Sequence, residues 1–319
     1  MKSNLRILFM GTPDFAVHIL DAIIQSNYQV VGVVSVPDKP AGRGQRIHES
    51  AVTKYAKKHQ LNLLQPKRLK SKSFLQDLKN LEIDIAVVVA FRMLPKEVWE
   101  IPSLGTFNLH ASLLPEYRGA APINWAIING ETTSGVTTFL IDEKIDTGNI
   151  LLQAKVDILP QENAGDLHDK LMQRGASLVL ETIEGLANRA LEAIPQPHTN
   201  DLKPAPKIFK DDVRIDWTKP LQHIHNFIRG LSPYPTAWTM ISTNNEMKLL
   251  KIYRASIEFK AHELAPNSVF KEGQKLGVAH PEGLIWLDEI QLEGKRRMNS
   301  LDFMNGYTLS NSSHVVNEH

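Results

Sequence analysis

Apolar runs and helical spacings alternate along the first 190 residues of the chain. The runs are short and apolar at consecutive positions, which is typical of strands buried on both faces of a parallel sheet. We expect strands at residues 5–11, 28–36, 83–91, 105–110, 134–141 and 148–156. Apolar residues at helical spacing predict helices at residues 14–26 and 164–189, and a polar helix is expected at 49–59. This alternation predicts an α/β fold with a mostly parallel sheet and helices on both faces.

The pattern changes after Leu191. Residues 193–212 contain four prolines and show no regular period, which indicates an ordered, semi-rigid linker. A helix is expected at 221–231, followed by short alternating stretches at 236–242, 247–257, 276–280 and 283–292. Short strands separated by turn residues predict a small, OB-like β-barrel. We therefore place a first domain at residues 1–190, a linker at 191–210 and a C-terminal domain at 211–319.

Composition narrows the class of protein. The 319 residues exceed one ordinary core, and 42% hydrophobic with 22% charged residues indicate a soluble globular chain. The net charge of +1 gives no overall basic field, so a nucleic acid would be met by local patches. The lack of cysteine excludes disulfides, thiolate zinc sites and cysteine nucleophiles, and it fits a reducing compartment. Without a signal peptide or an apolar run long enough to span a bilayer, we expect a cytoplasmic protein with no membrane partner.

Two short motifs have ordinary explanations. The stretch "MGTPDF" at 10–15 ends the first strand but lacks the glycine fingerprint of dinucleotide sites and the P-loop lysine. We interpret it as a helix entry with Asp14 as the cap. The tripeptide "DTG" at 146–148 also occurs in aspartic proteases, which need two such aspartates, whereas this chain has one copy. It is interpreted as a turn, and Asp146 stays a candidate active-site carboxylate.

The strongest candidate chemistry lies at the end of the strand at 105–110. Asn108 and His110 flank Leu109, so both side chains point to the same side of the strand. At the carboxyl end of a parallel strand, that side faces the crevice where α/β proteins bind ligands. A lone histidine there is more often structural, but an amide and a protonated imidazole can both donate hydrogen bonds. Two converging donors suit an oxyanion hole.

These motifs, taken together and in order, resemble the folate-dependent formyltransferase superfamily. The matching stretches are "GTPDFA" at 11–16, "PDKPAGRG" at 37–44, "VVVAFRMLP" at 87–95, "NLHASLLPEYRGAAPI" at 108–123, "GVTT" at 135–138 and "IDTGNIL" at 145–151. "VRIDW" at 213–217 and "PYPTAW" at 233–238 extend the match into the second domain. The "AGRG" loop, "RGAAPI" and the second domain narrow the resemblance to the branch that formylates a charged tRNA. The stretch "AFRMLP" is one residue shorter than the aromatic-glycine form of many members, which bears on the pterin pocket around Phe91–Pro95.

The resemblance implies a Rossmann-like formyltransferase domain followed by an OB-like domain that contacts tRNA. It implies 10-formyltetrahydrofolate as donor and, as acceptor, the α-amino group of methionine on initiator tRNA, for translation initiation. The family's catalytic positions fall on Asn108, His110 and Asp146. Its folate-binding stretch falls on Ser112, Leu113, Leu114 and Pro115, and its tRNA contacts fall on Arg43 and Lys207. We expect a monomer.

These residues suggest a mechanism in which an amine attacks a formyl carbon and creates an oxyanion. Asn108 and protonated His110 would donate to that oxyanion, while Asp146 orients His110 and guides the amine's proton. No metal is needed. Two alternatives stay open: a formyltransferase of the same superfamily that acts on a small amine such as a nucleotide sugar, and a folate- or tRNA-binding module without turnover. Basic clusters at "KPAPKIFK", "PKRLKSK" and "GKRRM" could contact tRNA or be solvated faces, and we favour the first, in the linker.

Overall fold

The computed structural model describes residues 5–26, 28–41, 46–197, 201–243, 246–307, 309–310 and 312–317. The chain divides into two compact units whose segments interleave along the sequence. The first unit comprises Met1–Gly119, Ser134–Val156 and Asp169–Pro204, and the second comprises Ala120–Thr133, Asp157–His168 and Ala205–His319. The single-cut domain limits expected from the sequence stay a prediction.

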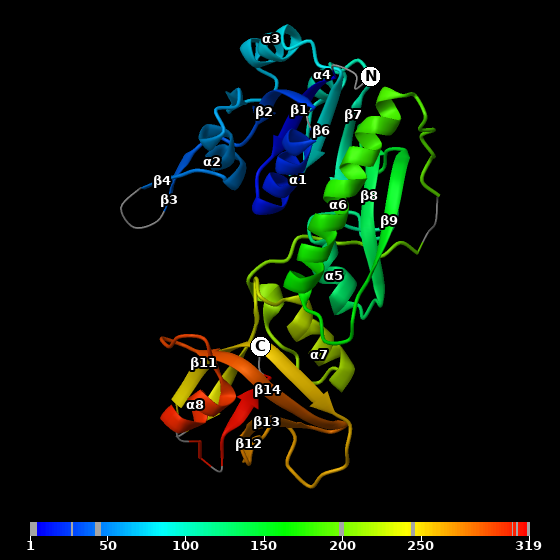
Figure 1. The fold of residues 1–319 in the computed structure, drawn as a ribbon. Coiled ribbons are helices and arrows are strands. Elements are labelled where there is room, and N and C mark those ends of the chain that lie inside the picture. The colour runs from blue at the N-terminus through cyan, green and yellow to red at the C-terminus, as the bar shows by residue number, and fades with distance from the viewer. Residues whose placement is uncertain are drawn as a thin grey trace. The chain divides into compact units, whose positions relative to one another are not determined.

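The sheet of the first unit has the strand order β5-β2-β1-β6-β7-β8-β9 (Figure 1). The strands are β1 (Arg6–Gly11), β2 (Gln29–Val34), β5 (Leu63–Leu64), β6 (Ile85–Val89), β7 (Thr106–His110), β8 (Thr133–Leu140) and β9 (Ile150–Asp157). Pairing is parallel from β5 to β7, and β7 pairs antiparallel with β8. The predicted mostly parallel α/β sheet is confirmed, and β7 is the strand at which the direction changes.

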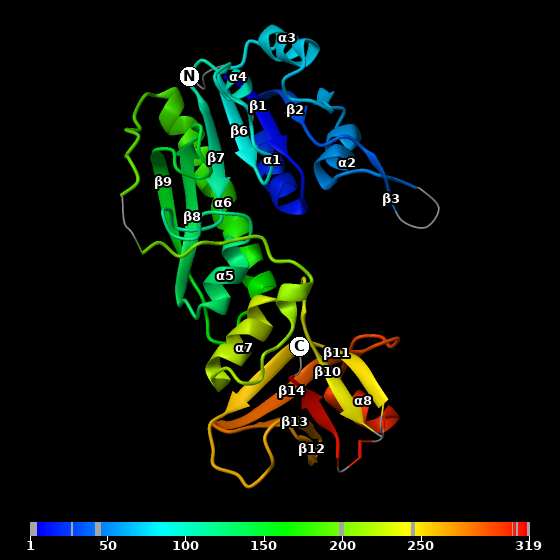
Figure 2. The same cartoon turned by 180° about the vertical axis from the view of Figure 1, so that it is seen from behind.

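Helices cover both faces of this sheet, as the alternation predicted. On one face lie α1 (Asp14–Gln25) and α6 (Ala164–Ala187), in front of the strands in Figure 1, and Leu109 of β7 packs against α6 at Gly175. Figure 2 shows the strands from the opposite side, where α3 (Lys72–Asn80) and α4 (Lys96–Trp99) lie. The side chains of α3 and α4 share a buried cluster there with Val88 of β6.

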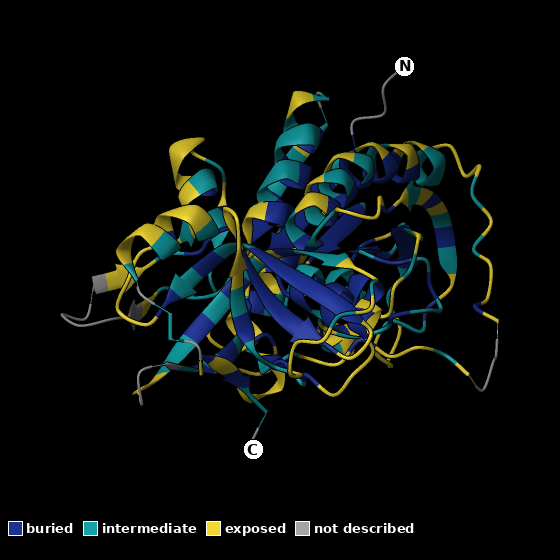
Figure 3. Ribbon diagram, turned by 90° about the horizontal axis from the view of Figure 1, so that it is seen from below, coloured by how far each residue is buried: buried dark blue, intermediate teal, exposed yellow. Residues whose placement is uncertain are grey.

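The strand register assigns the side chain of Asn108 to this second face. Val88 pairs directly with Asn108, and paired residues of neighbouring strands point to the same side of a sheet. His110 follows two residues later on β7 and therefore shares that side. Figure 3 shows the strands as mostly buried, with exposed residues gathered in the helices and connections. The candidate donors thus lie at the carboxyl end of a mostly buried strand.

Two details of the first unit correct the sequence interpretation. Helix α1 has Pro13 as its N-cap, and Asp14 is its first helical residue with no capping hydrogen bond, because the extended backbone that a cap requires falls on the proline. The stretch 37–46, expected as a loop, contains one short strand, β3 (Lys39–Ala41), and the first residue of another, β4 (Arg46–His48), and the two strands pair antiparallel. Proline is tolerated in such a two-stranded ribbon because each strand has a free edge.

The second unit is built on an antiparallel sheet with the order β12-β13-β14-β11-β10-β16. Its strands are β10 (Ala237–Thr243), β11 (Glu246–Glu258), β12 (Val269–Glu272), β13 (Lys275–His280), β14 (Gly283–Leu292), β15 (Met298–Asn299), which pairs with β14, and β16 (His314–Val316). The sheet closes on itself because β16 also bridges back to the start of β12, between His314 and Ser268. The predicted OB-like barrel is confirmed.

The remaining elements are short. The second unit contains α5 (Pro122–Ile128), α7 (Leu221–Gly230), α8 (Ser300–Gly306) and a 3-10 turn at Asp211–Val213, and the first unit contains α2 (Ala51–Lys58). The helices predicted at 49–59 and 221–231 correspond to α2 and α7, whereas α3, α4, α5 and α8 were not predicted. Within the part of the chain that the structure describes, no helix combines the length and apolar character that crossing a membrane requires.

The stability of the second unit depends on a neutral histidine. His225 of α7 is buried, and its Nδ1 has no hydrogen-bond partner among the described residues. Burial lowers the pKa of His225 below its usual 6.5, and the positive charge of Arg229 lowers it further, against a hydrogen bond with the Ala255 backbone. Below the unfolded pKa the unfolded chain therefore binds more protons than the folded chain. The contribution of neutral His225 to the free energy of unfolding is fully present above about pH 6.5, and it is lost as the pH falls from there through the pKa that His225 has in the folded state.

We expect the unfolding temperature of the wild type to fall more steeply from about pH 7 to about pH 5 than that of His225→Gln, because the variant lacks the titrating group. Thermal unfolding followed by circular dichroism measures both slopes. His314→Gln is the matched control, since His314 is exposed and should leave the slope unchanged. Parallel pH curves for the wild type and His225→Gln would contradict this role.

Candidate active site

His110 ends β7 as a buried imidazole with a fixed orientation. Its Nε2 lies 2.9 Å from the carbonyl oxygen of Tyr117. Because a carbonyl oxygen only accepts hydrogen bonds, Nε2 carries the hydrogen and donates it. The other ring nitrogen, Nδ1, lies 3.8 Å from Oδ2 of Asp146. Nδ1 is therefore the ring nitrogen that no hydrogen bond between the described residues uses, and it lies beside a carboxylate.

Asn108 provides the second donor on the same side of β7. Its side chain is partly buried, and no described residue forms a hydrogen bond with it. A partly buried amide without a protein partner is free to donate to a ligand oxygen. The structure thus places His110 against Asp146, with Asn108 two residues away on the same face of the sheet.

Asp146 lies in a turn that holds its carboxylate toward His110. Its backbone is left-handed, with φ of 55°, and its Oδ2 accepts a hydrogen bond of 3.0 Å from the Gly119 N–H. Gly148 is required in this turn, because a Cβ there would lie 1.7 Å from the carbonyl oxygen of Leu140. The "DTG" stretch is therefore a turn, as interpreted, and its aspartate also contacts the candidate histidine.

The segment after β7 is fixed by hydrogen bonds to β8 and β9. The Thr137 hydroxyl donates to the Ser112 carbonyl at 2.7 Å and accepts from the Leu114 N–H at 3.1 Å. Gln153 donates to the Leu114 carbonyl at 2.9 Å and to the Thr137 hydroxyl at 3.0 Å. Ser112 and Leu114 are buried, whereas Leu113 and Pro115 are half-buried. Thr137 and Gln153 were not among the predicted site residues, since a sequence does not show which strand side chains meet a loop.

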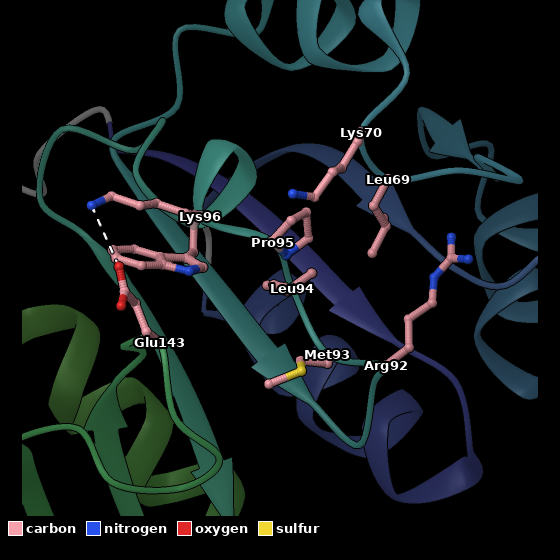
Figure 4. A pocket seen from close by; sticks show the side chains of 9 residues that line it. Leu69, Lys70, Arg92, Met93, Leu94, Pro95, Lys96 and Glu143 are labelled. Carbon is pink, nitrogen blue, oxygen red and sulfur yellow. Dashed lines mark ion pairs between the residues drawn. The ribbon is translucent and has the colours of Figure 1, made fainter.

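A cavity of about 500 Å³ lies beside the stretch "AFRMLP" (Figure 4). Its lining residues are Leu69, Lys70, Arg92, Met93, Leu94, Pro95, Lys96, Trp99 and Glu143. Leu69 and Leu94 belong to the buried cluster that also contains Val88, and Trp99 packs against it, so the cavity lies on the Asn108 face of the sheet.

Basic groups line part of this cavity. Lys70 and Lys96 are paired with Glu97 and Glu143 respectively. Arg92 has no carboxylate partner among the described residues: it donates to the carbonyls of Pro66 and Lys67, and burial lowers the pKa of its guanidinium. The cavity therefore combines an apolar wall with a cation suited to an anionic ligand group.

Of the two residues predicted to contact tRNA, the structure describes Lys207 but not Arg43. Lys207 is exposed, and its Nζ lies 5.2 Å from the ring centroid of Phe209, itself 58% exposed. Arg43 lies outside the described residues, so its predicted contact stays a prediction.

The fold and the candidate site suit an α/β enzyme of group transfer: Asn108 and His110 lie at the end of a parallel strand, and the Asp146 carboxylate, in the turn between β8 and β9, faces His110. Two family models match the chain in succession. One, described as formyl transferase, matches residues 5–183, and the other, described as formyl transferase, C-terminal domain, matches residues 207–308.

Relatives narrow the family further. The chain is 53% identical to a methionyl-tRNA formyltransferase of Flavobacterium johnsoniae, covering 98% of this chain and 99% of that protein. It is 48% identical to one of Bacteroides fragilis, covering 97% of each. The chain belongs to the formyl transferase family, in the branch of the methionyl-tRNA formyltransferases. A solved N-formyltransferase of Helicobacter canadensis is similar in fold, with a TM-score of 0.65 at 23% identity over 89% of this chain and 98% of that one.

Removing the Thr137 hydroxyl should loosen the segment after β7. Thr137→Val keeps the side-chain shape but leaves the Ser112 carbonyl and the Leu114 N–H unpaired in a buried place. We expect a loss of about 1–3 kcal/mol in the free energy of unfolding, measured in urea, and faster hydrogen exchange at the Leu114 amide. Thr138→Val is the matched control, because Thr138 bonds Thr182 on the opposite face. If Thr138→Val accelerated Leu114 exchange equally, Thr137 would not be the anchor.

Proposed function

We propose that the chain transfers the formyl group of 10-formyltetrahydrofolate to the α-amino group of methionine on initiator methionyl-tRNA, for translation initiation, and that Asn108, His110 and Asp146 carry the chemistry. The observation that carries the site assignment is the arrangement at the end of β7. His110 is held between the Tyr117 carbonyl and Asp146, and the unpartnered Asn108 amide lies on the same face.

The chemistry follows from which atoms are free. The amine nitrogen attacks the formyl carbon, a C–N bond forms, and the carbonyl oxygen becomes an oxyanion. Asn108 donates one hydrogen bond to that oxyanion, and because Nε2 of His110 is already used, Nδ1 of the protonated ring is the second donor. Collapse of the tetrahedral carbon breaks its bond to folate N10. The Asp146 carboxylate takes up the amine's proton, and the same proton is delivered to N10, which leaves as a neutral amine. No step uses a metal.

Binding of the formyl donor, 10-formyltetrahydrofolate, is assigned to the segment after β7 and to the cavity beside Phe91–Pro95. A rigid stretch at Ser112–Pro115, fixed by Thr137 and Gln153, would hold the folate next to Asn108. The apolar wall of the cavity near Phe91–Pro95 suits the flat pterin, and Arg92 suits the anionic part of the donor. The similar structure from Helicobacter canadensis contains folinic acid, which is a folate.

Acceptor binding is assigned to local basic groups, because the chain as a whole is nearly neutral. Lys207 would contact phosphate, and Arg43 would reach the end of the acceptor stem, where a guanidinium can contact phosphate and base edge together. We further infer that the protein acts as a cytoplasmic monomer.

A single assay tests the reaction. A labelled formyl donor is supplied together with charged initiator tRNA or, separately, with free amines such as a nucleotide-linked amino sugar. Formylation of the charged tRNA alone is expected. Preference for the amino sugar would support the small-amine alternative, and binding without transfer would support a module without turnover.

The catalytic assignment predicts the result of removing each group. Asn108→Ala, His110→Ala and Asp146→Ala should each lower kcat by at least about 10²-fold, because each removes a donor or the partner that orients one. Steady-state kinetics on charged tRNA measures the effect, and circular dichroism verifies the fold. His59→Ala, at the end of α2, is the control and should turn over normally. Near wild-type turnover in a folded His110→Ala variant would contradict the assignment of His110 to catalysis.

Neutralising Lys207 should weaken tRNA binding only. Lys207→Gln is expected to raise KM for charged tRNA and to reduce the slope of log affinity against log salt by about one, since one phosphate contact is lost. The KM for folate should not change. Lys271→Gln, at an exposed position of β12, controls for net charge. An unaltered salt slope would show that the basic cluster in the linker is an ordinary solvated surface and not a tRNA contact.

A further inference from the structure

Gln196 joins the two chain segments that hold His110. It is 7% exposed, although it lies in the proline-rich stretch that the sequence indicates as a linker. Its Nε2 donates to the carbonyl oxygen of Asp146 at 3.0 Å and to that of Gly148 at 2.8 Å. Its Oε1 accepts from Nε of Arg118 at 3.1 Å and from an Nη of the same side chain. Both donors and the acceptor of one buried amide are therefore used.

These bonds lie directly behind the contacts of the histidine. Asp146 presents its carboxylate to His110, and Gln196 fixes the backbone of the same residue. Arg118 follows Tyr117, whose carbonyl holds the other side of the imidazole. Gln196 thus bonds Asp146 on one side of the imidazole and Arg118, next to Tyr117, on the other. It forms no hydrogen bond with His110 itself among the described residues.

The same segment grips the Tyr117 side a second time. The Tyr117 N–H donates to the carbonyl of Lys203 at 2.7 Å, and the Lys203 N–H donates to the Glu116 carboxylate at 2.8 Å. Tyr117 has a left-handed backbone with φ of 58°, which an aromatic residue keeps only when its surroundings impose it. The linker residues are therefore part of the frame around the histidine.

We propose that Gln196 is a positioning residue for the formyl-transfer site, which sets the place of the Asp146 carboxylate relative to His110. This inference rests on the proposed function. A side chain that merely filled space would be replaceable by an apolar one of the same length. A positioning amide is not, because the carbonyls of Asp146 and Gly148 need its two N–H donors. Misplacement of a catalytic group by a fraction of an ångström lowers turnover and leaves substrate binding largely intact.

The test is a mutant cycle on turnover. Gln196→Met removes the hydrogen bonds and keeps the length. We expect kcat to fall about ten- to a hundredfold with both KM values within about twofold of the wild type. In an Asp146→Ala background the same substitution should have no further effect on kcat, because the group that Gln196 places is already gone. Gln291→Met is the matched control, since Gln291 of β14 is a similar clasp in the second unit, which accepts from the Tyr253 hydroxyl and donates to the Lys295 carbonyl.

A second variant separates the two halves of the amide. Gln196→Glu keeps the acceptor for Arg118 but, when ionised, cannot donate to the Asp146 and Gly148 carbonyls. It should therefore lose kcat as Gln196→Met does, and it serves as well if the apolar variant does not fold. A loss of the same factor with and without Asp146 would overturn the proposal, as would a kcat equal to that of Gln291→Met. A wild type that formylates no amine would instead refute the proposed function.

Discussion

Two residues with left-handed backbones hold the one histidine at the end of β7. Tyr117 gives its carbonyl to Nε2, and Asp146 turns its carboxylate toward Nδ1. A non-glycine residue in this conformation costs on the order of 1–3 kcal/mol, so the surrounding bonds must over-determine it. Gly119, Gln196 and the Lys203 backbone supply those bonds. The orientation of the imidazole, and with it the choice of Nδ1 as the free ring nitrogen, depends on this frame.

The sheet topology explains why such a frame can form at this strand. β7 is parallel to β6 and antiparallel to β8, so the chain that leaves His110 runs beside Thr137 of β8, its register partner. The Thr137 hydroxyl can then fix the Ser112–Leu114 backbone directly. A fully parallel sheet would send the chain away into a helix on one face. Because the strand direction reverses at β8, the chain forms a loop at the end of β7, where the backbone groups of Ser112 and Leu114 bond the Thr137 side chain.

The sequence predicted what depends on local pattern. Period and run length predicted the buried strands, and the spacing of Asn108 and His110 predicted a shared face, with which the unbroken register of β7 against β8 from Asn108 to His110 agrees. Contacts between distant segments could not be predicted this way. Gln196 lies 50 positions from Asp146, and a glutamine between two prolines carries no signal of burial. The predicted N-cap of α1 was wrong, because Pro13 and not Asp14 has the extended backbone that precedes the helix. Composition alone does not decide between two such neighbours.

The donor geometry also limits how the proton can travel. Nδ1 of His110 and Oδ2 of Asp146 are 3.8 Å apart, beyond a direct hydrogen bond, whereas the same Oδ2 accepts a 3.0 Å bond from the Gly119 N–H. The carboxylate is thus held by a backbone N–H and not by a hydrogen bond to the ring. An oxyanion that draws Nδ1–H toward itself would not displace Asp146. In the proposed mechanism, that independence would let Asn108 and His110 donate to the oxyanion while the carboxylate accepts the proton of the attacking amine.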